Sequence, residues 1–186
     1  TLRHVAPPGG TCTGEQRVAI ALSARGVRGS SQPDLPSPVI DMIDALARRP
    51  ATVRREGVDE LSGLLGGPDP YLELLGIVAR VVAVDTFDRA LGRPVASLPE
   101  PRPGEPTRAV NSLARPGAAW VPMVGGSSIT HALSMVPEEN AEVELLHGAL
   151  YLTYAEISDP LVRRSLNRAQ MELVAARTSV CNECFY

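Results

Sequence analysis

Lysine is absent from this 186-residue sequence, and aromatic residues are scarce. All 18 basic residues are arginines, which we interpret as a compositional bias of the source rather than a functional signal. Phe, Trp and Tyr make up 4% of the residues, so the core has to be built from Ala, Leu, Val and Ile. That composition favours packed helices over a β-sandwich, which depends on aromatic and β-branched side chains.

Long apolar runs are also missing. No stretch approaches the roughly 20 residues that a helix needs to span a bilayer, and the N-terminus lacks the charged-then-apolar pattern of a signal peptide. Three cysteines are too few for a disulfide scaffold, so we expect free or redox-active thiols. No Met precedes Thr1, so we expect a processed or trimmed chain. These absences predict a soluble, cytoplasmic protein.

The length and the charge narrow the class further. A chain of 186 residues suits one ordinary domain or two small ones, with a core that needs no metal or disulfide framework. The net charge of -3 gives no reason to expect a polyanion as partner. We therefore expect no nucleic acid, no membrane and no cofactor.

Apolar periodicity and capping residues predict helices along most of the chain and no strand. In the first half, the expected helices cover residues 14–25, 38–49, 53–65 and 69–91. The middle of the last of these, residues 74–87, is apolar nearly all round. Such a helix is usually buried between other helices or at a subunit interface.

A Pro-rich stretch divides the chain. Proline occupies positions 94, 99, 101, 103 and 106, which is typical of a linker. We therefore expect a helical half over residues 1–93, a linker over 94–110 and a second helical half over 111–186. In that second half, Trp120 is expected to anchor packing rather than to stack on a substrate.

Further helices are expected over residues 127–136 and 138–157, followed by a last one beginning at Asp159, which would serve as its cap. His131 and His147 lie on the first two and are expected to be packing histidines, because nothing in the local sequence pairs with them. The last helix would bury an apolar stripe that alternates in steps of four and three: Val162, Leu166, Ala169, Leu173, Ala176 and Val180.

Two of the cysteines, Cys181 and Cys184, form a C-x-x-C unit at the end of the sequence. Such a unit is compatible with a redox pair or with half of a zinc site. Zinc needs about four ligands, and neither a second cysteine pair nor a close histidine cluster is present. Two buried thiols that act only as small hydrophobic side chains are the third alternative.

Glu172 precedes Cys184 by twelve positions, which on a straight helix would separate the two residues by about 18 Å. The two side chains could then not cooperate. A break near residues 178–182, with Asn182 as cap of a new helix, would allow the chain to fold back. A thiol in that first turn would face the positive end of the helix dipole, which stabilises the thiolate. Glu172 would be the nearby proton acceptor, unless Arg168 or Arg177 holds it in a plain ion pair.

The segment AQMELVAARTSVCNECFY, with Glu172 and Cys184, resembles the alkylhydroperoxidase D and carboxymuconolactone decarboxylase superfamily, in particular its peroxidase-related branch. In that family a Glu is followed by eleven residues, a Cys, two residues, a second Cys, three residues and a His. Glu172 and Cys184 match the Glu and the first Cys. The position of the second Cys would follow Tyr186.

The resemblance covers most of the chain, but with the halves in an unusual order. The opening residues TLRH are similar to the segment that follows the second Cys, which places His4 at the motif histidine. Trp120 and the segment 131–157 are similar to the region upstream of the Glu. We therefore expect a fragment of a tandem duplication, a permuted fold or a chain whose written order breaks within the motif.

The resemblance implies an all-α helical bundle of the alkylhydroperoxidase D type that forms a homo-oligomer, and a thiol-dependent peroxidase with a small peroxide substrate and a dithiol reductant. In the family, the second Cys attacks the peroxide, the first resolves it as a disulfide, and the Glu and His relay protons. On this pattern Glu172, Cys184 and His4 are site residues. Cys181, one turn before Cys184, is a candidate substitute for the attacking thiol that the family pattern itself does not include. The rival hypotheses are a decarboxylase or tailoring enzyme of the same fold, and a catalytically silent helical oligomerisation module.

Overall fold

The structure is a computed structural model that describes residues 2–27, 33–126 and 128–182. Within these ranges the regular elements are all helical, apart from two isolated single-pair bridges, so the all-α prediction is confirmed. The chain forms two compact units, Thr1–Val143 and Glu144–Tyr186. In the described ranges no helix is both long and apolar enough to cross a membrane.

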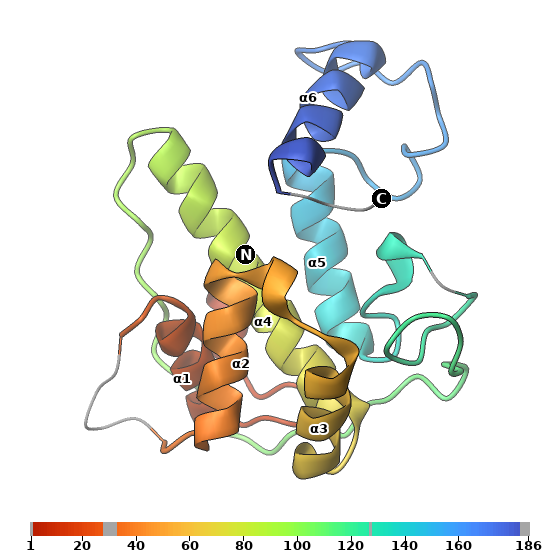
Figure 1. The fold of residues 1–186 in the computed structure, drawn as a ribbon. Coiled ribbons are helices and arrows are strands. Elements are labelled where there is room, and N and C mark those ends of the chain that lie inside the picture. Colours follow the sequence, from red (N-terminus) through yellow and green to blue (C-terminus); the bar gives the residue numbers. More distant parts are fainter. Residues whose placement is uncertain (1, 28–32, 127, 183–186) are drawn as a thin grey trace. The chain divides into compact units, whose positions relative to one another are not determined.

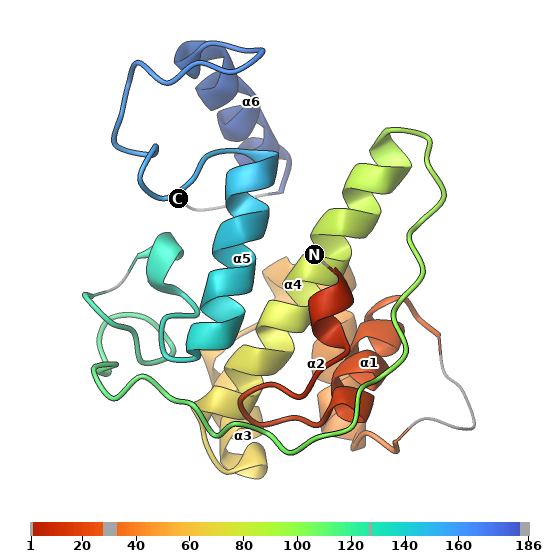
Figure 2. The same cartoon turned by 180° about the vertical axis from the view of Figure 1, so that it is seen from behind.

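The first unit is organised around α4 (Pro68–Ala90), the longest helix described. Figures 1 and 2 show α4 beside three shorter helices, which all contact it: α1 (Gly14–Ala24), α2 (Ser37–Arg48) and α3 (Arg55–Leu65). The α4 side chains in this core are apolar on most sides of the helix, as the sequence predicts, and the most deeply buried are Leu72, Leu74, Ile77, Val78 and Val81. The short 3-10 helices η1 (Leu2–Val5) and η2 (Pro50–Thr52) complete the described elements around this core.

Local signals explain where these helices begin and end. Thr13 and Gln16 form a capping box at the start of α1, in which each side chain accepts from the other residue's backbone N–H. Gly66 ends α3 in the left-handed conformation, with φ of 86°, which glycine adopts at low cost. Proline at the start of α2 and of α4 has a φ that suits the first helical turn.

The Pro-rich segment runs beside the N-terminal segment within the first unit and is hydrogen-bonded to it. The backbone N–H groups of Arg102, Thr107 and Arg108 donate to the carbonyls of Ala6, Gly9 and Gly10, each at 2.8 Å. Residues 94–110 belong to the first compact unit.

The segment between residues 111 and 150 differs from the prediction. Where a helix over 127–136 was predicted, the described residues contain only the 3-10 turn η3 (Ile129–His131), and the helix predicted over 138–157 is present as α5 (Pro137–Leu150), which ends seven residues earlier. Proline suits a first helical position better than an interior one, because it lacks the N–H that an interior position needs. Trp120 is 47% exposed, so the prediction that it anchors packing within this chain was wrong.

The last helix, α6 (Arg168–Cys181), begins nine residues later than predicted. Asn167 and Gln170 form a capping box at its start, whereas the Asp159 carboxylate accepts from the Leu161 N–H two residues on, which makes a local turn instead of a helix cap. The predicted buried stripe on α6 was also wrong: Leu173 is 72% exposed and Val180 67% exposed, and Met171 is the one buried residue on this helix.

Candidate functional site

Glu172 lies in the second turn of α6 and is held by two donors. The Tyr151 hydroxyl donates to Oε1 at 2.5 Å, and Arg168 Nε donates to the same atom at 2.6 Å. The hydrogen bond from Tyr151, followed by that from Arg168, lowers the pKa of Glu172 below its ordinary value. The Glu172 side chain is 48% exposed, so its carboxylate is accessible to solvent. Its lowered pKa favours the ionised form, which pairs with Arg168.

Arg168 is itself fixed by the loop that precedes α6. Its Nη1 donates to the carbonyls of Glu156 at 3.1 Å and Asp159 at 3.0 Å, and its Nη2 donates to that of Ile157 at 2.9 Å. The guanidinium therefore joins the loop to the helix and holds Glu172 in one place. This is the plain ion pair that the sequence left open as the alternative to a proton-accepting role.

Cys181 is the last residue of α6 and is exposed. It follows Glu172 by nine positions on one continuous helix, which separates the two Cα atoms by about 13 Å along the axis and places them on opposite sides. The C-terminal end of a helix is the negative end of its dipole, which disfavours a thiolate. The helix ends at Asn182, and Cys184 lies outside the described residues.

His4 lies in η1 of the first unit, with its Nδ1 3.0 Å from Glu142 Oε1. Its backbone carbonyl accepts from Arg17 Nη2 at 3.0 Å. Glu172 and Cys181 belong to the second unit, so His4 and these two predicted site residues lie in different compact units.

A buried ionic network in the first unit has no counterpart in the sequence prediction. Arg17 of α1, Arg80 of α4 and Glu139 of α5 are almost fully buried. Arg17 Nη2 donates to Glu139 Oε1 at 2.7 Å, and Arg80 Nη2 donates to the other oxygen of the same carboxylate. Burial alone would lower the pKa of Arg17, but Glu139 and Glu73 outweigh it and raise that pKa. The network therefore keeps the guanidinium charged inside the core.

Glu73 of α4 connects this network to the N-terminal segment. Arg17 Nη1 donates to Glu73 Oε1. The other oxygen accepts from Thr11 N and Thr11 Oγ1, both at 2.6 Å, and from Cys12 N at 3.2 Å. A buried carboxylate with four donors is well satisfied, and the arrangement fixes the backbone of residues 11–12 against α4.

Cys12 lies beside Glu73 and is a poor nucleophile. Burial, followed by the negative charge of Glu73, raises the pKa of its thiol to about 11. Because the thiolate is the reactive form, a thiol with this pKa stays protonated near neutral pH. The environment of Cys12 is therefore structural and is the reverse of the activated thiol that peroxide chemistry requires.

The sequence did contain a signal for the network. Glu73, Arg80 and Asp85 lie on a helix that is otherwise apolar nearly all round. A charged side chain on such a helix has to be buried, and a buried charge requires a partner of opposite sign. The partners themselves could not be predicted, because Arg17 and Glu139 come from distant parts of the chain.

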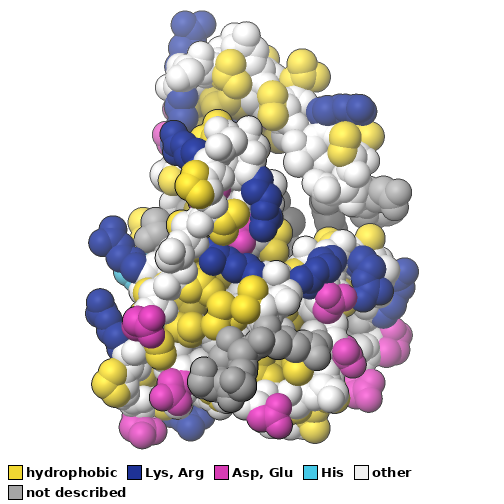
Figure 3. Space-filling view, turned by 90° about the vertical axis from the view of Figure 1, so that its left-hand side faces the viewer, with side chains coloured by type: hydrophobic (Ala, Val, Ile, Leu, Met, Phe, Trp, Pro, Cys, Tyr) yellow, Lys and Arg dark blue, Asp and Glu magenta, His cyan; other side chains and the backbone are white. Residues whose placement is uncertain are grey.

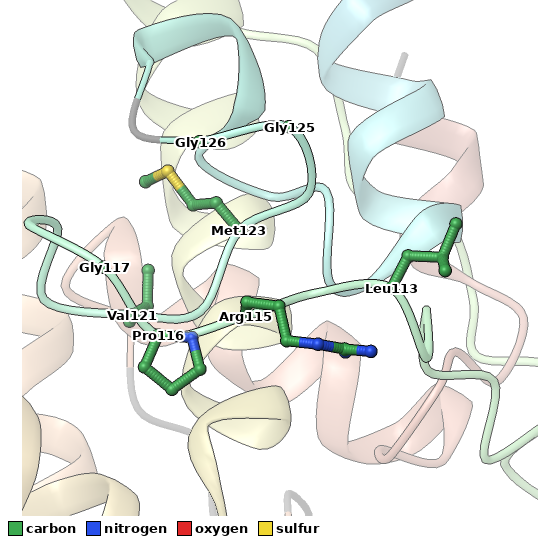
Figure 4. Close-up of a pocket in the computed structure, with 8 residues that line it drawn as sticks. All are labelled: Leu113, Arg115, Pro116, Gly117, Val121, Met123, Gly125 and Gly126. Carbon is green, nitrogen blue, oxygen red and sulfur yellow. The ribbon is translucent and has the colours of Figure 1, made fainter.

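Concave regions occur in both units of the described residues. A small pocket of about 160 Å³ is formed by the segment 113–126, with Arg115 and Met123 at its wall (Figure 4). In the second unit, a groove of about 570 Å³ lies beside Tyr151 and has a mainly apolar lining from Leu150, Leu166, Met171 and Val174. We call this second region the Tyr151 groove.

A third region, of about 780 Å³, lies in the first unit between α2 and α3, and we call it the α2–α3 groove. Met42, Ala45, Val53, Leu61 and Leu64 give it an apolar surface, and its other lining residues are Pro38, Asp41, Thr52, Arg54, Gly57 and Glu60.

Among the described residues, no group of three or more His, Cys, Asp or Glu side chains is arranged to hold a metal ion. Comparison with known proteins adds no relative: no protein-family model, curated protein or solved structure matches this chain.

Proposed function

We propose that this protein is a thiol-dependent peroxidase whose site contains Glu172 and Cys184, with Cys181 as the second thiol of the redox pair. The observation that carries the proposal is the state of Glu172, which Tyr151 and Arg168 hold as an accessible carboxylate on the helix that leads directly into Cys181. The family pattern, in which a Glu is followed after eleven residues by a Cys, supports the pairing of Glu172 with Cys184.

The chemistry proceeds in three balanced steps. One thiolate attacks the terminal oxygen of a hydroperoxide, the O–O bond breaks, and a sulfenic acid and an alcohol form. The second thiol displaces the sulfenic oxygen as water and forms a disulfide. An external dithiol then reduces the disulfide by exchange and is itself oxidised. Glu172 accepts the proton of the Cys184 thiol and returns it to the leaving oxygen.

The Tyr151 groove supports a small organic hydroperoxide as substrate. Its lining is mainly apolar, and Tyr151 joins it to Glu172 through the hydroxyl that donates to the carboxylate. An alkyl group can occupy the apolar surface while the polar peroxide remains beside the hydrogen-bonding groups. A cytoplasmic location belongs to the same proposal, because free thiols persist in a reducing compartment.

Hydroperoxide consumption by the purified full chain, with a dithiol as electron donor, tests this function. We expect turnover to be lost in Cys181→Ser and Cys184→Ser. In Glu172→Gln, kcat/KM should fall by at least about 10²-fold, since general acid–base catalysis contributes at least that factor. Cys12→Ser is the matched control, because its thiol is buried and outside the pair. The proposal fails if the wild type consumes no hydroperoxide or if Cys184→Ser is as active as the wild type.

A second candidate is a catalytically silent helical oligomerisation module. The exposed apolar residues of α6 favour it, because an apolar helix face is stable when a partner covers it. Oligomerisation of the full chain that persists when all thiols are alkylated, without hydroperoxide turnover, would support this candidate over the peroxidase.

A further inference from the structure

The exposed side of α6 carries a continuous apolar stripe. Ala169, Leu173, Ala176 and Val180 follow each other in steps of four, three and four, so they share one side of the helix, and all four are exposed. Figure 3 shows hydrophobic side chains at the surface of the second unit, among arginines. We call these four residues the α6 stripe.

Arg177 flanks the α6 stripe. It follows Leu173 by four positions and is exposed, and within the described part of the chain it has no hydrogen bond or ion pair. Glu172 flanks the stripe on the opposite side, but Tyr151 and Arg168 already hold its carboxylate. Among the residues of α6 that the structure describes, Arg177 is therefore the free charge beside the stripe, and it is positive.

The α2–α3 groove has the complementary shape. Its helical lining comes from positions 38, 41, 42 and 45 of α2 and 57, 60, 61 and 64 of α3, which is the i, i+3, i+4, i+7 pattern on both helices. The lined part of each helix therefore spans seven residues, or about 10 Å. Leu173 and Val180 are also seven residues apart, so two turns of α6 match the length of the groove.

The charges of the groove are complementary as well. Asp41 belongs to α2 and Glu60 to α3, and both carboxylates are exposed and lack an ion pair or hydrogen bond among the residues that the structure describes. Arg54 also lines the groove but pairs with neither carboxylate, since its Nη1 donates to the carbonyls of Ala51 at 2.6 Å and Val53 at 2.9 Å. Two carboxylates with one guanidinium leave the lining with a net negative charge. An apolar helix with a free cation at its flank satisfies both features of this groove.

We propose that α6 of one copy of this chain docks in the α2–α3 groove of a second copy, as in other helix-in-groove complexes. Leu173, Ala176 and Val180 contact the apolar surface, and Arg177 pairs with Asp41 or Glu60. Stable interfaces bury about 1,600 Å² in total, which favours a symmetric dimer that uses the helix and the groove of both copies. This inference does not depend on peroxidase activity.

The oligomeric state of the full chain, measured by light scattering and sedimentation over a range of concentrations, tests the proposal. We expect a dimer, with a dissociation constant raised about 30-fold or more by Leu173→Glu or by Leu64→Glu, as for interface residues that contribute most of the binding energy. Leu161→Glu is the control, because Leu161 is exposed in the second unit and lies outside α6. A wild-type monomer at every soluble concentration, or equal effects of all three substitutions, overturns the proposal.

A charge exchange tests the register of the helix in the groove. Arg177→Glu and Glu60→Arg should each weaken the dimer, by up to about fivefold as for exposed ion pairs, and the two together should restore it. Arg163→Glu and Glu56→Arg are matched controls, exposed on the same unit and on the same helix respectively but outside the contact. Helicity and thermal unfolding confirm that each variant folds. Additive weakening of the dimer in the double variant rejects docking between copies, and so does a wild-type protein that stays monomeric.

Discussion

At the scale of single residues, the Glu172 carboxylate and the Cys12 thiol have opposite environments. Glu172 is exposed and held as an anion by Tyr151 and Arg168. Cys12 is largely buried beside the negative Glu73 and stays protonated. The local sequence indicates only the pairing of Glu172 with Arg168, because Tyr151 and Glu73 are distant in the chain from the groups that they affect.

Removing the Tyr151 hydroxyl should raise the pKa of Glu172 toward its ordinary value, because that hydrogen bond is the largest cause of the lowering. The carboxylate signal of Glu172 in an NMR titration of Tyr151→Phe would show the shift. Since the folded-state pKa is lowered, the stabilisation by this ion pair is present above the unfolded-state pKa and is lost as pH falls through the folded-state value. Tyr154→Phe is the control and should leave the titration unchanged.

Alkylation should distinguish the two described thiols. At pH 8, Cys181 should react with iodoacetamide well before Cys12, because Cys181 is exposed and the pKa of Cys12 is raised to about 11. Mass spectrometry of digested samples over time measures both rates in one experiment. Equal rates, or faster labelling of Cys12, would show that residues 9–14 open readily and that Cys12 is not buried in solution.

At the scale of elements, α4 combines an apolar helix with three buried charges. Glu73 and Arg80 face the network, and Asp85 accepts two hydrogen bonds from Arg25, at 3.0 and 2.8 Å. Gly76 lies opposite Glu139, and its lack of a side chain allows α4 and α5 to approach. The packing of α4 therefore depends on specific charged partners and on a close contact at Gly76, in addition to the apolar side chains that its sequence indicates.

Gly76→Ala should destabilise the protein by about 1–3 kcal/mol, because a Cβ there would lie 2.6 Å from Glu139 Oε2 and 3.0 Å from its Cβ. The gain in helix propensity, about 1 kcal/mol, is too small to offset this clash. Gly63→Ala in α3 is the matched control: no atom lies within 4 Å of its added Cβ, so it should be neutral or stabilising. Urea unfolding of both variants gives the comparison, and a stabilised Gly76→Ala protein would contradict the packing described.

At the scale of the whole molecule, the ionic network joins α1, α4, α5 and the N-terminal segment of the first unit through charges that are nearly inaccessible to water. Arg17 Nε and Arg80 Nη1 are buried without a hydrogen bond among the described residues, so the network is not fully satisfied. Burial, partly offset by Glu139, lowers the pKa of Arg80. The stability of the first unit therefore depends strongly on the carboxylates of Glu73 and Glu139, which pair with Arg17 and Arg80.

Glu139→Gln should lower the free energy of unfolding by about 3–5 kcal/mol, because it leaves Arg80 and Arg17 without the carboxylate that they share. Denaturant unfolding followed by circular dichroism measures the loss. Glu105→Gln, at an exposed position of the Pro-rich segment, is the control and should change the free energy of unfolding by less than about 0.5 kcal/mol. Similar stability of the two variants would show that the network contributes little.

Much of the fold of the first unit could be predicted from local signals. Thr13, Gly66 and Gly92 mark helix ends through caps and left-handed backbone, which depend only on neighbouring residues. The start of α6 was missed because Asp159–Pro160 resembles a helix start as closely as Asn167 does. The site was less predictable: Glu172 and its pairing with Arg168, four residues away, follow from sequence, but Tyr151 is 21 positions distant.

The sequence by itself determined the helical class, the positions of α1 to α4 and the apolar stripe on the last helix, because each depends on residue type and on spacing within a few turns. Only the tertiary structure decided which apolar faces are covered and which charges meet. It buried Arg17, Glu73, Arg80 and Glu139 together and left the α6 stripe exposed. The physical reason is that periodicity determines which side chains share a face of a helix, whereas burial depends on what packs against that face.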